Sequence, residues 1–164
     1  MAKEKENRKD KILKSVVDEG LKEKADTKIK KDEWIRATMM IEVLAVREDT
    51  TKSALEKHVE ALSKEKQVIM YRKDFGKIIG VMNPLPNNPN IKEAYSQVVE
   101  LECAVRRYED LIQIVMHYGP SSVEILEPTK LKLDLGEAQG ILNSVSDLIH
   151  KFVAAGVGGV VIRS

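Results

Sequence analysis

Residues 97–128 have the pattern of a strand, a helix and a second strand, and residues 37–73 repeat it. The segments 37–46, 67–73, 98–105 and 121–128 are rich in β-branched and long apolar residues, which is typical of strands. An apolar stripe at helical spacing separates each pair. These stripes are Ala54, Leu55, Val59 and Leu62 in the first unit, and Leu111, Ile112, Val115 and Met116 in the second. The repeat predicts a ferredoxin-like split βαβ fold, an α+β sheet of four antiparallel strands with two helices on one face. Another α+β arrangement of the same elements is the alternative.

Composition limits the classes of protein that this chain can belong to. Only 4% of the 164 residues are aromatic, so the core must be built from aliphatic side chains and methionine. The net charge of +1 argues against a general nucleic-acid binder, which needs a basic excess to neutralise phosphates. A single cysteine rules out an intrachain disulfide and favours a reducing compartment. The charged start is unlike a secretory signal, and no apolar run approaches the roughly 20 residues of a membrane span. We therefore expect a cytoplasmic protein that does not engage membranes.

The chain divides into three predicted parts. Residues 1–33 are densely charged, and Ile12, Leu13, Val16, Val17 and Leu21 fall at helical spacing, which predicts an amphipathic helix followed by a break at Gly20 and a lysine-rich linker. Residues 34–128 form the ferredoxin-like domain. Residues 129–164 form a C-terminal helix, with Asp134 and Glu137 as a capping box, and a glycine-rich tail. Either flanking helix is a candidate surface for a protein partner.

Signals at the ends of the helices are also readable in the domain. Asp49, Thr50 and Thr51 are candidate N-caps for the first helix. Glu109 and Asp110 suit the first turn of the second helix, where they complement its dipole, and Gly119 suits its C-terminal end.

A long segment at 74–96 contains three prolines and several asparagines and is predicted to be irregular. A loop of this length inside a compact domain is typically functional or mobile. Its amide side chains offer hydrogen-bond donors and acceptors beside apolar residues. The candidate ligand residues of this loop are Asn83, Asn87, Asn88 and Asn90.

Four strand glutamates are the most chemically suggestive group. Side chains alternate along a strand, so Glu100 and Glu102 share one face, and Glu42 and Glu124 also stand opposite apolar neighbours. In the split βαβ plan all four lie on the face away from the helices. One interpretation is a solvated face whose acids pair with Arg36, Arg72 or Lys73. A self-association face and a divalent-metal site are the alternatives. Such an acidic face argues against reading RNA on the sheet, which uses aromatic and basic residues.

Other reactive side chains give weaker signals. Cys103 lies among apolar strand residues and is predicted to be a buried small hydrophobe. His58, His117 and His150 show no metal-ligand spacing and are expected on helix surfaces or ends. The glycines of GVGG (156–159) lack the lysine of a phosphate-binding loop and are predicted to belong to a flexible tail. The sequence therefore predicts no cofactor.

The segment 100–132 contains Tyr118, Gly119 and Pro120 followed by VEILEP at 123–128. It resembles the C-terminal extension of WYL-domain transcription regulators over about 35 residues. The resemblance implies a ferredoxin-like fold with a role in oligomerisation and ligand sensing. The winged helix-turn-helix and the Trp-Tyr-Leu domain of those regulators have no counterpart here, so their regulatory function does not carry over. The chain is also similar to small archaeal proteins with an EVL…PSSVEILEP pattern, a likeness that brings no known activity.

The favoured hypothesis is a non-catalytic module that forms homo-oligomers, as a dimer, or binds a small ligand. Apolar stripes on both flanks of a small domain leave surface to bury, and a two-fold dimer buries it most simply. One alternative is a divalent-metal-binding protein or enzyme that uses Glu42, Glu100, Glu102 and Glu124. The other is an RNA-associated protein that uses the lysine-rich segment 22–31 as an arm.

Overall fold

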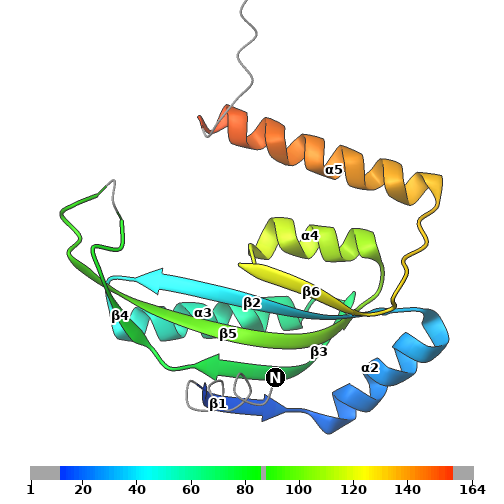
Figure 1. Ribbon diagram of the computed structural model, residues 1–164, viewed down its shortest axis with the longest axis horizontal. Helices are drawn as coiled ribbons and strands as arrows, with labels where there is room; N and C mark the ends of the chain where they lie inside the picture. Colours follow the sequence, from blue (N-terminus) through cyan, green and yellow to red (C-terminus); the bar gives the residue numbers. More distant parts are fainter. Residues whose placement is uncertain (1–11, 86–87, 157–164) are drawn as a thin grey trace, which may run out of the picture.

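The computed structural model describes residues 12–85 and 88–156, which form a six-stranded antiparallel sheet and four helices (Figure 1). The strands are β1 (Ile12–Val17), β2 (Ile35–Ala45), β3 (Val68–Gly76), β4 (Ile79–Met82), β5 (Glu93–Val105) and β6 (Ser122–Glu127). The helices are α2 (Glu19–Asp32), α3 (Glu48–Ser63), α4 (Tyr108–Tyr118) and α5 (Leu135–Ala154). The α+β class is confirmed. The prediction of four strands is wrong, because β1 and β4 enlarge the sheet.

The strand order across the sheet is β1-β3-β5-β2-β6. One edge of the long central strand β5 pairs with two strands in succession, since β3 lies along residues 99–105 and β4 along residues 93–96. The other edge of β5 pairs with β2 from Ile35 to Ala45, and β6 pairs with β2 in turn. The sheet therefore ends in β1 on one side and β6 on the other.

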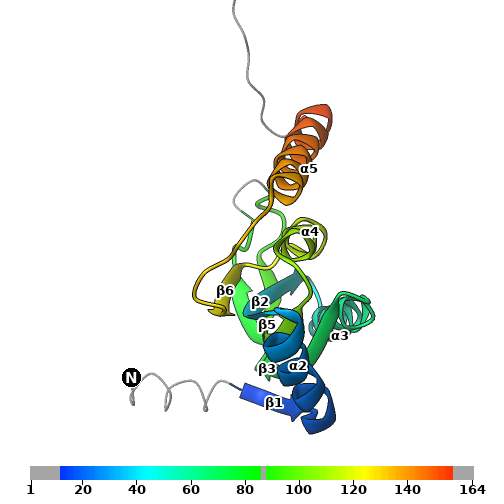
Figure 2. The same ribbon diagram turned by 90° about the vertical axis from the view of Figure 1, so that its right-hand side faces the viewer.

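The main core lies between the sheet and the helices α3 and α4, which occupy the same side of it in Figure 2. Alternate residues of β2, from Ile35 to Ile41, point into this core and are at most 2% exposed. They meet Leu55, Val59 and Leu62 of α3 and Leu111 and Ile114 of α4. The core is almost wholly aliphatic, as the composition predicts. The predicted stripe of α4 is partly wrong, because Ile114 is buried whereas Val115 is 40% exposed.

The N-terminal segment differs from its prediction. Residues 12–17 form the edge strand β1, which pairs with β3, and not an amphipathic helix. The helix α2 begins just afterwards, where the side chain of Asp18 accepts a hydrogen bond from the Leu21 N–H at 2.9 Å. Gly20 thus lies in the first turn of a helix, and the predicted linker forms the rest of it. Ala25 of α2 packs on the face of the sheet opposite α3 and α4, in a second small core with Ile69, Tyr71 and Ala104.

Within the segment 74–96, residues 74–76, 79–82 and 93–96 belong to strands, which corrects the prediction of a loop that is irregular throughout. The strand β3 continues to Gly76, β4 follows, and β5 begins at Glu93. The prediction failed because the short strand β4 contains a glycine and is followed at once by prolines. The true connection is therefore the segment 83–92.

The helix ends were predicted with mixed success. The capping box of Asp134 and Glu137 is present at the start of α5. Gly119 adopts a left-handed conformation (φ 56°) at the end of α4, which favours glycine. The N-cap of α3 is Arg47, without a side-chain hydrogen bond, so the predicted caps are wrong. Thr51 instead lies inside the helix, fully buried, and its hydroxyl donates toward the Arg47 carbonyl (2.9 Å) or the Tyr95 carbonyl (3.1 Å).

Among the described residues, no helix is both long and apolar enough to pass through a bilayer.

Candidate functional site

The register of the sheet places the four predicted glutamates on one face, the face away from α3 and α4. Thr38 of β2 pairs with Glu102 on one side and with Glu124 on the other. Met40 pairs with Glu100, and Glu42 follows two residues later. Directly paired residues project from the same side of a sheet, as do residues two apart on one strand. We call this surface the open face.

Arg72 connects two acids of the open face. Its guanidinium contacts Asp74 at 2.5 Å and Glu102 at 3.6 Å. The hydrogen bond to Asp74 raises the pKa of Arg72, although burial opposes the charge. Asp74 is 4% exposed and also accepts a hydrogen bond from the hydroxyl of Ser15 on β1. Arg72 therefore links acids on two strands, and Asp74 connects this pair to the edge strand.

Arg36 forms a second charged centre on the same face. It donates to Asp26 of α2 at 2.6 Å, to the Tyr71 hydroxyl at 2.7 Å and to Glu127 of β6 at 3.0 Å. Burial disfavours its charge, but the hydrogen bonds to Asp26 and Tyr71 outweigh this and raise the pKa of Arg36. The hydrogen bond between Arg36 and Asp26 is also the main reason that the pKa of Asp26 is lowered. One guanidinium thus joins α2 and β6 to the middle of the sheet.

Tyr71 joins the two centres. Its hydroxyl accepts from Arg36 and donates to Glu102 at 2.8 Å. Burial and the hydrogen bond to Glu102 raise the pKa of Tyr71, so the hydroxyl keeps its proton. Asp26, Arg36, Tyr71, Glu102, Arg72 and Asp74 form one continuous network, which we call the open-face network. Of the basic residues expected to pair with the predicted glutamates, Arg72 contacts Glu102, whereas Arg36 forms its ion pairs with Asp26 and Glu127. Lys73 stands opposite Leu101 on the helix side.

The four predicted glutamates are not arranged around a common metal position. Glu42 accepts a hydrogen bond from the hydroxyl of Ser96, and Glu102 is held in the open-face network. In the part of the chain that the structure describes, no group of three or more histidine, cysteine, aspartate or glutamate side chains is arranged to hold a metal ion. The geometry gives no support to a metal site at Glu42, Glu100, Glu102 and Glu124, which stays a prediction.

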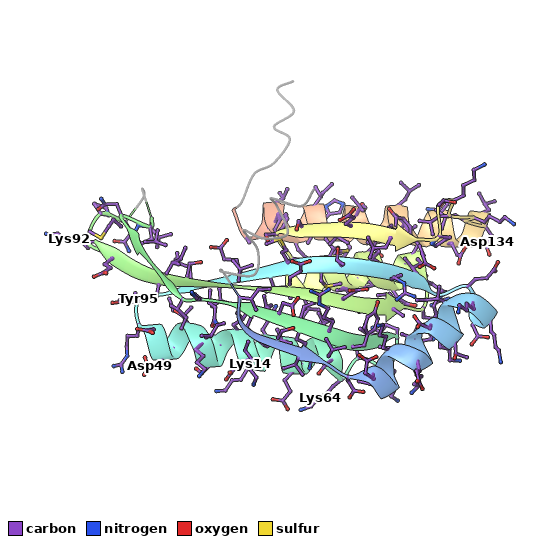
Figure 3. All side chains as sticks on the ribbon, turned by 60° about the horizontal axis from the view of Figure 1, so that its bottom comes forward. Lys14, Asp49, Lys64, Lys92, Tyr95 and Asp134 are labelled. Carbon is purple, nitrogen blue, oxygen red and sulfur yellow. The ribbon has the colours of Figure 1, made fainter. Side chains whose placement is uncertain are left out.

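The asparagine loop lies at the end of the sheet marked by Lys92, opposite the end where Asp134 lies (Figure 3). Asn83 has a left-handed backbone (φ 49°), and its N–H donates to the Lys92 carbonyl at 2.8 Å. The backbone of Asn88 also holds the loop, donating to Leu85 and accepting from Ile91. Asn87 lies outside the described residues, and Asn90 lies in a turn. The ligand role of this loop therefore stays a prediction.

The lysine-rich segment 22–31 is not an extended arm, because it forms most of α2. Two of its lysines make ion pairs within the helix, Lys22 with Glu19 at 3.9 Å and Lys28 with Asp32 at 2.6 Å. Lys28 also lies 5.7 Å from the ring centre of Trp34. An RNA-binding role for this segment would have to use the surface of an ordered helix.

Cys103 is fully buried, as its apolar neighbours predicted. Burial is the main cause that raises the pKa of this thiol to about 12, and the nearby Glu102 adds to it. A thiol without access to solvent and with so high a pKa is inert toward solvent-borne electrophiles. The glycines 158 and 159 lie outside the described residues.

His58 and His117 each make a hydrogen bond to a backbone carbonyl, and His150 lies exposed on α5. His58 contacts the Tyr118 carbonyl through Nε2 at 2.9 Å, and His117 contacts the Gln113 carbonyl through Nδ1 at 2.8 Å. Both line a hollow of about 560 Å³ between α3 and α4. The hydroxyl of Tyr118, also in this hollow, donates to Glu65 at 2.7 Å. The bonds of His58 and Tyr118 fix the end of α4 against α3 and the turn that follows it, whereas the His117 bond lies within α4. Both histidines lie on helices, as expected.

A cleft that the sequence did not indicate lies at the end of the sheet nearest Asp134. It has a volume of about 680 Å³ and is formed by four stretches of chain: the end of α2 with the start of β2, the turn from β5 into α4, the linker from β6 to α5, and the first turn of α5. Its lining includes Trp34 and Tyr108 and several lysines and arginines. We call it the terminal cleft. Volumes of this size are typical of small-molecule sites.

These features define the protein as a small α+β domain with a six-stranded antiparallel sheet, a charged network on its open face and a terminal cleft. The chain matches the MJ0538 family over residues 36–163 and belongs to that family. The match begins at the start of β2, so β1 and α2 lie outside it. No curated protein and no solved structure matches the chain significantly. The likeness to WYL-domain regulators receives no support from these comparisons.

Proposed function

We propose that this MJ0538-family protein is an interaction module that forms homodimers by pairing α5 with the α5 of a second copy. The observation that carries the proposal is an apolar stripe along this helix. Leu142, Val145, Ile149 and Phe152 are 64%, 42%, 53% and 49% exposed. Figure 1 places α5 beyond α4, which separates it from the sheet. Large exposed apolar patches of this kind mark interaction sites in soluble proteins.

The spacing of the stripe supports a copy of the same helix as the partner. The four residues follow one another at intervals of three, four and three positions, so the pattern reads the same in both directions. In an antiparallel pair, Leu142 would pack against Phe152 of the second copy and Val145 against its Ile149. Such alternating intervals of three and four are the spacing of a coiled-coil seam. A two-fold axis requires this kind of self-complementary surface.

Charge also favours pairing of two copies. At about 100° per residue, the charged side chains of α5 lie away from the stripe, and Asp147 and Lys151 pair with each other at 2.6 Å. Gln139, Ser146 and Val153, which flank the stripe on its solvent side, are uncharged. The net charge of +1 leaves little long-range repulsion between copies.

Sedimentation equilibrium of the full chain tests the proposal. Wild type is expected at twice the monomer mass, and Val145→Glu/Ile149→Glu is expected at the monomer mass with an unchanged circular-dichroism spectrum. Each introduced charge would lie unpaired in the seam, at a cost of several kcal/mol by order of magnitude. The matched control is Asn143→Glu/His150→Glu, on the polar side of α5, which should remain dimeric. A monomeric wild type, or a dimer that survives in the seam variant, would refute pairing through α5.

We also infer that β2, β3, β5 and β6, with α3 and α4, form a ferredoxin-like unit to which β1, β4 and α2 are added. The order β3-β5-β2-β6, the antiparallel pairing and the placement of α3 and α4 on one face support this inference. In such a unit the second and fourth strands are the edges, and here β1 extends the edge formed by β3. An experimental structure whose order of these four strands differs would contradict it.

A further inference from the structure

The terminal cleft has an excess of positive charge. Five basic and four acidic side chains line it; the basic ones are Lys30, Arg106, Arg107, Lys130 and Lys132, and the acidic ones are Asp32, Glu33, Glu127 and Glu137. Two of the acids are neutralised by cations from outside the lining. Lys28 contacts Asp32 at 2.6 Å, and Arg36 contacts Glu127 at 3.0 Å. More basic than acidic side chains of the lining are therefore left without an opposite charge from outside it.

The cations of the cleft are only partly compensated. Arg106 and Arg107 share a single carboxylate, that of Asp110, at 3.0 and 3.4 Å. Lys30, Lys130 and Lys132 make no ion pair among the residues that the structure describes. These three lysines come from α2 and from the linker between β6 and α5, so they approach the cleft from two sides.

Apolar and aromatic groups complete the lining. Trp34 is half-buried against Ile69 and Tyr71 of the second core and forms part of the wall. Leu131 and Leu133, which alternate with the two linker lysines, remain 36% and 43% exposed. A flat apolar ring could pack against such a wall, while a phosphate or carboxylate met the lysines. Aromatic platforms beside cationic side chains are a recurrent way of holding a nucleobase and its phosphate.

We propose that the terminal cleft binds a small anionic ligand with a flat ring, of the nucleoside-phosphate class. Trp34 and the linker leucines receive the ring, and Lys30, Lys130 and Lys132 receive the anion. This site is separate from the dimer seam of α5, because the seam residues Leu142 to Phe152 do not line the cleft. Failure of the proposed dimer would therefore leave this proposal intact, and the reverse also holds.

Trp34 is the only tryptophan of the chain, so intrinsic fluorescence reports directly on the cleft. The full-length protein is titrated with AMP, GMP, CMP and UMP, and with adenosine and inorganic phosphate as the separate halves of the ligand. We expect a saturable change with at least one nucleotide. Adenosine and phosphate should each bind at least about tenfold more weakly than that nucleotide, since each retains only part of the contacts.

Charge reversal in the linker tests the role of the lysines. Lys130→Glu/Lys132→Glu is expected to weaken nucleotide binding by about tenfold or more, which corresponds to roughly 1.4 kcal/mol. Both positions are exposed, so the fold should not change. Lys57→Glu/Lys66→Glu, with the same change of net charge on exposed positions of α3 and the turn after it, should bind as wild type does.

Two results would overturn the proposal. The first is no saturable change with any of the nucleotides, and the second is an equal loss of binding in the two lysine variants.

Discussion

Replacing Tyr71 with phenylalanine tests whether the open-face network stabilises the fold. The ring of Tyr71 is 2% exposed and packs in the second core with Ala25, Ile69 and Ala104. Its hydroxyl is the only group that joins Arg36 to Glu102 in the described structure, at 2.7 and 2.8 Å. Phenylalanine keeps the packing and removes both hydrogen bonds, so the substitution isolates their contribution.

The expected loss follows from the two bonds. A hydrogen bond to a charged group contributes about 1.5–3 kcal/mol to stability. Arg36 keeps Asp26 and Glu127, and Glu102 keeps Arg72 at 3.6 Å, so neither charge is left without a partner. We therefore take the low end for each bond, a total of about 3 kcal/mol. For a chain of this size, this loss lowers the melting temperature by roughly 6–12 °C.

Urea unfolding followed by Trp34 fluorescence measures this loss, because Trp34 packs against the same small core. The control is Tyr95→Phe, since the Tyr95 hydroxyl makes no hydrogen bond among the described residues; its free energy of unfolding should stay within about 0.5 kcal/mol of wild type. A double-mutant cycle with Glu102→Gln should give a coupling energy of at least about 1 kcal/mol. A Tyr71→Phe variant as stable as the control would refute the role of the network.

Two further predictions concern single buried groups. The pKa of Asp110 is lowered because hydrogen bonds to Arg106 and Arg107 outweigh the opposing effect of burial. The stability that comes from this lowered pKa is complete above the ordinary value of 3.8 and is lost as pH falls through the lower pKa of the folded state. Asp110→Asn should therefore flatten the decline of the urea midpoint in acid. The exposed control is Glu56→Gln, and an Asp110→Asn variant with the same pH profile as this control would argue against the prediction. The thiol of Cys103, fully buried and with its pKa raised to about 12 mainly by burial, should react with a thiol reagent only as fast as the chain opens, and rapid labelling of the native protein would disprove this placement.

The parts of the fold that were predicted are those whose local signals agree with their packing. In β2 and β5 alternate residues are buried against α3 and α4, so the period of two is visible in the sequence. The capping box at Asp134 fixes the start of α5, and the 3.6-residue period continues along the helix. The contact with α4 covers only part of one side of α5, and no residue of α5 is buried. The sequence therefore identified a helix without revealing how little of it would be covered.

The N-terminal elements were mispredicted because their signals are weak or misleading. In β1, Leu13, Val16 and Val17 are 58%, 40% and 45% exposed, so no alternation between a buried and a solvent face marks this edge strand. Its existence depends on pairing with β3, about sixty residues away in the chain. In α2 only Ala25 is buried, and a single small residue among many lysines gives no apolar stripe. Both elements therefore depend on tertiary contacts and not on a local sequence signal.

The candidate sites could be predicted only where one strand carries the information. The shared face of Glu100 and Glu102 follows from alternation along β5, and Arg72 contacts Glu102 as expected. Arg36 forms its ion pairs with Asp26 and Glu127, which are not among the predicted glutamates. Alternation along β3 places Tyr71 with Ile69, opposite Val68 and Met70. The bulge between Met70 and Arg72 then also brings Arg72 to the open face, so alternation along the strand does not show that Tyr71 and Arg72 lie on the same face. The terminal cleft was missed because four separate stretches of chain form it. Such a convergence depends on the strand order and has no local signal.

The family match begins at residue 36, so it includes most of the side chains that contact one another on the open face but not those of α2. Arg36, Tyr71, Glu102 and Glu127 all lie inside the matched region, whereas Asp26 on α2 lies outside it. Without α2, Arg36 would keep two of its three partners, but Ile69 and Tyr71 would lose the cover that Ala25 provides. The helix α2 thus supplies both the apolar cover of the second core and the Asp26 carboxylate that binds Arg36. Since α2 also delivers Lys30 and leads into Trp34, the segment that covers this end of the open face also builds one side of the terminal cleft. Removing residues 1–33 would therefore uncover the second core and dismantle the proposed ligand site together.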